Sequence, residues 1–134
     1  MRLLEPGHRI DAFVIDECIH SGGMAHIYRV HCADPARQPD FPIVMKVPRL
    51  STDEGAENLV GFEVEKQILS AIHGPHAPRF VAAGDLNDPY IVMERLAGKA
   101  LLQRLPDLPL PYEEVAEIGW KIATALADIH RQHV

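Results

Sequence analysis

Short runs of β-branched and apolar residues, separated by turn-forming segments, dominate the first two thirds of the chain. Five such runs predict strands over residues 13–19, 26–32, 43–47, 79–83 and 90–94. The last of these runs is almost continuously apolar, so we expect it inside the sheet rather than at its edge. The small residues of 21–25 predict a hairpin between the first two strands. The pattern therefore predicts a five-stranded antiparallel sheet.

Helical spacing of apolar residues appears twice. It covers residues 57–72, where the stripe consists of Leu59, Phe62, Ile68, Leu69 and Ile72. The stretch Ser51–Glu54 has the spacing of a capping box at the start of that helix. A longer helix is predicted from Tyr112, with a stripe of Val115, Ile118, Ile122, Leu126 and Ile129. Residues 99–105 could form a short helix, and the proline-containing segment 33–42 is expected to be an exposed loop. The fold class predicted is α+β.

Two charges interrupt these apolar patterns. Lys46 lies within the strand 43–47, and Glu65 lies on the same helical stripe as Phe62 and Leu69. Lysine is almost never buried unless it is paired, so Lys46 could be a solvated charge on an edge strand. The alternative is that Lys46 and Glu65 pair. A small-residue turn, a strand lysine and a helix glutamate, in that order, are the parts of an ATP phosphate clamp.

Five short motifs occur in a consistent order along the chain. They are Gly22-Gly23-Met24, Ile43-Val44-Met45-Lys46, Phe62-x-x-Glu65 with Leu69, Pro89 to Glu94 continuing to Gly98, and Leu126 to His130. Each motif alone is weak, but their order and spacing resemble the small lobe of a protein kinase. The resemblance is greatest to bacterial Ser/Thr kinases of eukaryotic type, and it covers about residues 6–134.

This resemblance implies a small, nucleotide-binding lobe over residues 1–97, followed by the hinge and the first helices of an incomplete large lobe over 98–134. It implies that Lys46 contacts the ATP phosphates and is held by Glu65. The other ATP-binding residues that it implies are Gly22, Gly23 and Met24 in the phosphate loop, Ile19, Ile27 and Val44 above the adenine, Met93 behind it, and the backbone of Glu94 and Leu96 at its edge. Ordinary core packing is the alternative for Ile27, Val44 and Met93.

The chain also departs from the family pattern. His20 and Ala25 stand where the phosphate loop usually has its first and third glycines, and a Cβ there restricts φ. Val44 replaces the usual alanine above the adenine, and overpacking of this kind commonly costs about 1–3 kcal/mol. These substitutions leave nucleotide affinity open.

The printed residues end at Val134, before the place where the family has its catalytic His-Arg-Asp and Asp-Phe-Gly motifs, and neither motif occurs in the chain. We therefore expect this chain alone not to transfer phosphate, and we expect Mg²⁺ only in the complete kinase. The expected partners are ATP, a protein substrate held by the missing large lobe and, through the 112–134 helix, a second copy of the chain. The alternative function is a non-catalytic, pseudokinase-like module that regulates or binds a partner.

Composition narrows these possibilities. The net charge of −6 argues against a nucleic-acid module, and no apolar run approaches the 18 residues of a membrane span. Two cysteines suggest a reducing, cytoplasmic setting. The pairs Cys18-x-His20, His31-Cys32 and His73-x-x-His76 invite a zinc interpretation. However, the predicted hairpin separates the two cysteines by about 13 Å, so no metal site is expected.

Overall fold

The computed structural model describes residues 3–50 and 55–134, which form two units. The first unit comprises the chain up to Ala71 together with Pro78–Arg95, and the second comprises Ile72–Ala77 and Leu96–Val134. The predicted capping box at Ser51–Glu54 lies outside the described residues. None of the helices in the described ranges combines the length and the apolar character that crossing a membrane requires.

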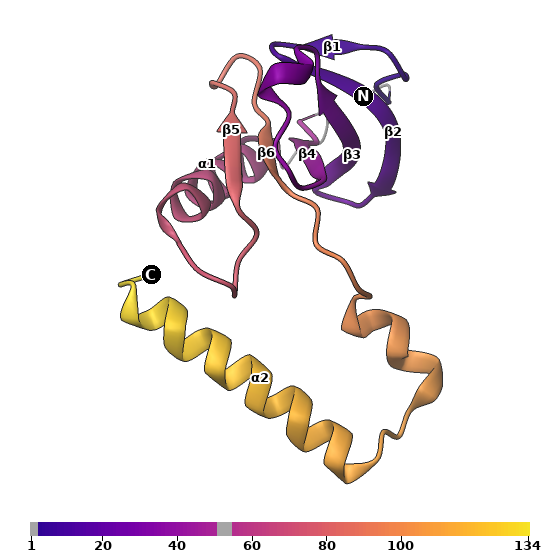
Figure 1. Ribbon diagram of the computed structural model, residues 1–134, viewed down its shortest axis with the longest axis vertical. Coiled ribbons are helices and arrows are strands. Elements are labelled where there is room, and N and C mark those ends of the chain that lie inside the picture. The colour runs from indigo at the N-terminus through magenta and orange to yellow at the C-terminus, as the bar shows by residue number, and fades with distance from the viewer. Residues whose placement is uncertain (1–2, 51–54) are drawn as a thin grey trace. The chain divides into compact units, whose positions relative to one another are not determined.

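A six-stranded antiparallel sheet forms most of the first unit (Figure 1). In spatial order its strands are β1 (Arg9–Ile10), β2 (Phe13–Ser21), β3 (Ala25–Cys32), β4 (Ile43–Pro48), β6 (Ile91–Glu94) and β5 (Phe80–Ala83). The five predicted strands are present, and β6 lies inside the sheet as its apolar sequence indicated. The prediction of five strands is wrong by one, because β1 is too short, at two residues, to show any periodicity.

The strand register separates the side chains of β4 between two environments. Ile43, Met45 and Val47 are buried in the hydrophobic core, together with side chains from β2, β3 and β6. Val44 and Lys46 alternate with them and therefore lie on the opposite face. Within the sheet, Lys46 pairs with Ile27 of β3 and with Ile91 of β6. The lysine thus emerges from the middle of the sheet on the face away from the core.

Helix α1 (Gly55–Ala71) packs against β4 and β5. Phe62 is its one fully buried side chain among the described residues. The Nζ of Lys66 forms an ion pair with Glu63 at 2.6 Å and lies 3.4 Å from the carbonyl oxygen of Gly84. This contact connects α1 with the turn that joins β5 to β6, so the helix is held by apolar packing at one point and by polar contacts at another.

The second unit contains a 3₁₀ helix, Leu101–Asp107, and the long helix α2, Tyr112–Arg131. The guanidinium of Arg104 binds Glu114, and its Nε lies 2.8 Å from Asp107, so one side chain links the two helices. Near the end of α2, the amide of Gln132 exchanges two hydrogen bonds of 2.8 Å with the backbone of His73. The predicted short helix is present, although it lies two residues later than expected.

Gly84 allows the close approach that the β5–β6 turn requires. Its N–H donates to the carbonyl of Tyr90 at 2.9 Å, and a Cβ added here would lie 2.1 Å from the backbone oxygen of Asp88. We expect Gly84→Ala to lower the free energy of unfolding by about 1–3 kcal/mol, measured by chemical denaturation. Gly61→Ala is the matched control, because a Cβ at Gly61 meets no atom within 4 Å. Equal stability of the two variants would contradict this account.

Candidate functional site

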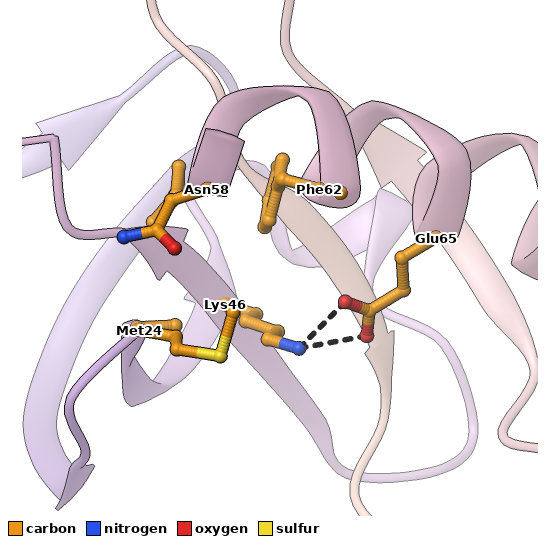
Figure 2. Close-up of a pocket in the computed structure, with 8 residues that line it drawn as sticks. Met24, Lys46, Asn58, Phe62 and Glu65 are labelled. Atoms are coloured by element: carbon orange, nitrogen blue, oxygen red, sulfur yellow. Dashed lines mark hydrogen bonds and ion pairs between the residues drawn. The ribbon is translucent and has the colours of Figure 1, made fainter. Parts of the chain in front are cut away.

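A pocket of about 190 Å³ opens where the β2–β3 turn, β4 and α1 meet (Figure 2). The turn contributes Met24 and, at the start of β3, Ala25. The other lining residues are Lys46 and Pro48 of β4 and Asn58, Gly61, Phe62 and Glu65 of α1. Three segments far apart in the sequence therefore build one concave surface, and it contains a cation, a carboxylate and an amide.

Lys46 and Glu65 face each other across this pocket. The Nζ of Lys46 lies 2.7 Å from each carboxylate oxygen of Glu65, and the side chains are 24% and 38% exposed (Figure 2). Because β4 lies between β3 and β6, the interpretation of Lys46 as a charge on an edge strand is wrong. A lysine ammonium has three N–H donors. Glu65 takes two of them, so one remains for an anionic ligand.

The register brings together three of the residues expected around an adenine. Ile27 pairs with Lys46, and Val44 pairs with Met93, so all three lie on the face that carries the lysine. Val44 is buried, while Ile27 and Met93 are half-buried. Ile19 differs, because it falls at an irregularity in the β2–β3 pairing and is 39% exposed. His20, rather than Ile19, pairs with Ile27.

The two expected hinge residues fall in different units. The backbone N–H of Glu94 donates to the carbonyl of Arg79 at 2.8 Å, and its carboxylate binds the Arg79 guanidinium at 3.2 Å. Hydrogen bonds from Arg79 lower the pKa of Glu94, so the carboxylate stays charged. Leu96 belongs to the second unit, where it is exposed.

The turn between β2 and β3 is held by Arg49, a residue that the sequence did not single out. The Arg49 Nη1 donates to the carbonyl of Gly22 at 2.9 Å, and its backbone N–H donates to the carbonyl of Met24 at 2.8 Å. Gly23 lies between Gly22 and Met24, the two residues whose carbonyls Arg49 binds. Arg49 directly follows a strand and belongs to no periodic pattern, so the sequence offered no signal beyond its charge.

The histidines and cysteines do not gather into a metal site within the described ranges, where no three His, Cys, Asp or Glu side chains are grouped suitably for an ion. Cys18 pairs with Tyr28, as the predicted hairpin required, and Cys32 pairs with Phe13. Both cysteines are free thiols.

His26 is buried beside the turn, with only 2% of its surface exposed. Its Nδ1 lies 2.9 Å from the Ser21 hydroxyl. Burial lowers the pKa of His26, and the nearby Arg49 charge lowers it further. The folded protein therefore favours the neutral ring, whereas the unfolded chain takes up a proton near pH 6.5.

The difference between the pKa of His26 in the folded and unfolded states predicts that the protein loses stability in acid. The contribution of His26 to stability is fully present above pH 6.5 and is lost as the pH falls from 6.5 toward the lower folded-state pKa. The free energy of unfolding, measured by denaturant titration between pH 7.5 and 5, should fall by up to about 1.4 kcal/mol per pH unit. His26→Gln should flatten this slope, and His8→Gln, at an exposed histidine, should not. An identical slope in all three proteins would refute the assignment.

The chain is similar in sequence to bacterial serine/threonine-protein kinases. The chain is 34% identical over 119 residues to the serine/threonine-protein kinase PknK of Mycobacterium tuberculosis, and 28% identical over 120 residues to a probable serine/threonine-protein kinase of Clostridium perfringens. These matches cover 86% and 88% of this chain but only 10% and 17% of the relatives. No family model matches the chain.

Solved structures show the fold. The kinase domain of M. tuberculosis PknI superposes with a TM-score of 0.76 at 22% identity, over 97% of this chain and 52% of that domain. A structure described as the apo form of PpkA-294 gives a TM-score of 0.62 at 21% identity, over 80% of this chain and 43% of its own. The described residues thus have the α+β fold of a kinase small lobe with the helices that follow it.

Proposed function

We propose that this chain, which resembles the N-terminal part of bacterial Ser/Thr protein kinases in sequence and fold, binds ATP. The chain is the nucleotide-binding portion of such a kinase, and the whole protein transfers the γ-phosphoryl group of ATP to Ser or Thr of a protein in the cytoplasm. The observation that carries this proposal is the Lys46–Glu65 ion pair in a pocket bordered by the turn that contains Gly22 and Gly23.

The residues present fit a nucleotide. The remaining N–H donor of Lys46 binds the α- and β-phosphates, while Glu65 keeps the ammonium in place. The Gly22 N–H already donates to the carbonyl of Ala25 at 3.0 Å, so the backbone N–H groups of Gly23 and Met24 bind the phosphate oxygens, since glycine permits close approach. The adenine lies against Ile27 and Val44.

Residues at the end of β6 complete the proposed adenine site. Met93 bounds the adenine from behind, and the backbone of Glu94 binds its edge. Magnesium ions, when bound in the whole protein, neutralise charge that develops on the phosphates. The motifs that would hold them, His-Arg-Asp with its Asn and Asp-Phe-Gly, do not occur in the printed sequence. Phosphoryl transfer is therefore proposed for the protein that contains those motifs.

The non-catalytic alternative rests on His20 and Ala25 in the phosphate loop. The comparisons give it no support, because the relatives are named as kinases. The ion pair also argues for nucleotide binding, since a module that only binds a partner protein has no need of a phosphate clamp.

ATP with magnesium should raise the thermal midpoint of the chain, because a ligand that binds only the folded state stabilises it. At ten times the Kd the gain is about 1.4 kcal/mol. Lys46→Ala should remove most of the shift in a thermal denaturation series, because the phosphate-binding cation is lost. Lys121→Ala, which removes an exposed lysine of α2, is the control and should keep the shift. If millimolar ATP leaves the wild-type midpoint unchanged, the proposal fails.

The apolar stripe of α2 should drive self-association. Ile122 and Leu126 lie one turn apart and are 50% and 47% exposed. Sedimentation velocity should therefore show concentration-dependent dimers. Replacing both residues with Glu should weaken dimerisation at least about tenfold, because the apolar area is no longer covered. The control Lys121→Glu alters charge on the same helix without removing apolar surface. A wild-type chain that sediments as a monomer at every concentration would contradict this prediction.

A further inference from the structure

Arg49 makes three contacts that meet at the nucleotide pocket. Its Nη1 binds the carbonyl of Gly22 at 2.9 Å, and its backbone N–H binds the carbonyl of Met24 at 2.8 Å. Its own carbonyl lies 3.4 Å from the amide nitrogen of Asn58, a pocket residue on α1. One residue therefore connects the turn, the end of β4 and the helix that carries Glu65.

These contacts fix the orientation of the turn. In a trans peptide the C=O and the following N–H point in opposite directions. When Arg49 holds the Gly22 carbonyl, the N–H of Gly23 is directed away from Arg49. Likewise, because the Arg49 backbone N–H holds the Met24 carbonyl, the N–H of Ala25 is directed away from Arg49. Without the Arg49 side chain the Gly22–Gly23 peptide can rotate, and a carbonyl oxygen could then face the phosphates and repel them.

The surroundings of Arg49 favour a fixed cation. His26, which lies close enough for the Arg49 charge to lower its pKa, stays neutral and does not compete for the turn carbonyls. The Nε of Arg49 is buried and has no hydrogen-bond partner among the described residues. Leaving a buried N–H unpaired is costly, so this arginine is not explained by stability alone.

We propose that Arg49 is a positioning residue of the nucleotide site, which holds the Gly22–Met24 turn so that N–H groups, not carbonyls, face the phosphates. The inference rests on the proposed ATP-binding function and adds to it a residue that touches the loop and not the ligand.

The test compares ATP with adenosine, which lacks phosphates, by isothermal titration on the 134-residue chain. Arg49→Gln should weaken ATP about tenfold and leave adenosine unchanged, because only phosphates contact the turn. Arg49→Lys keeps the charge but not the guanidinium geometry, so it should weaken ATP similarly. Arg37→Gln, at an exposed arginine of the same unit, should bind both ligands as the wild type does.

Each other outcome overturns the proposal. Wild-type affinity in Arg49→Lys would mean that the charge alone matters, and equal loss of ATP and adenosine would mean a general structural role. Hydrogen exchange without nucleotide provides an independent measurement. Arg49→Gln should speed exchange of the 22–25 amides roughly five- to tenfold, and an unchanged rate would show that Arg49 does not hold the turn. If the wild-type chain binds no ATP, the proposed function fails, and the exchange rates still decide whether Arg49 holds the turn.

Discussion

The ion pair between Lys46 and Glu65 is the interaction on which the geometry of the pocket depends. It joins β4 to α1 across 19 residues of sequence. An unpaired ammonium beside Ile91 and Phe62, which are both buried, would be costly, so the lysine needs a carboxylate. Both partners are partly exposed, and such pairs contribute only about 0–1 kcal/mol to folding. The pair therefore matters more for the placement of α1 over the sheet than for stability.

Arg49 provides a second connection between the same elements. Lys46 contacts the helix at Glu65, while Arg49 contacts it near its start, at Asn58, and also holds the turn above the pocket. A displacement of α1 would therefore strain both connections. The position of the helix and the shape of the turn are therefore coupled through Lys46, whose ammonium binds Glu65, and through Arg49. The backbone carbonyl of Arg49 accepts from the Asn58 side chain, and its guanidinium donates to the carbonyl of Gly22.

The sequence predicted those parts of the molecule that have a repeating pattern or a charge out of place. Runs of β-branched and apolar residues located β2 to β6, and the charges within apolar runs identified Lys46 and Glu65. Other features depend on contacts between distant residues, which leave no local pattern. Strand β1 exists only because it pairs with β2, the irregularity at Ile19 is a property of the β2–β3 pairing, and the hold of Arg49 on Gly22 spans 27 residues.

The structure also changes how the two missing loop glycines should be understood. Glycine is required where φ is positive, yet among the described residues positive φ occurs only at Gly7, Asp11, Gly74, Gly98 and His133. His20 and Ala25 thus adopt backbone conformations open to any residue, and their Cβ atoms cause no backbone strain. The remaining effect of these two substitutions is the volume of their side chains. Ala25 is buried within the strand, whereas the His20 ring lies so near Gly22 that a Cβ there would be 3.2 Å from its Nε2. For the proposed binding of phosphates at the turn, the volume of the His20 side chain therefore matters more than backbone strain.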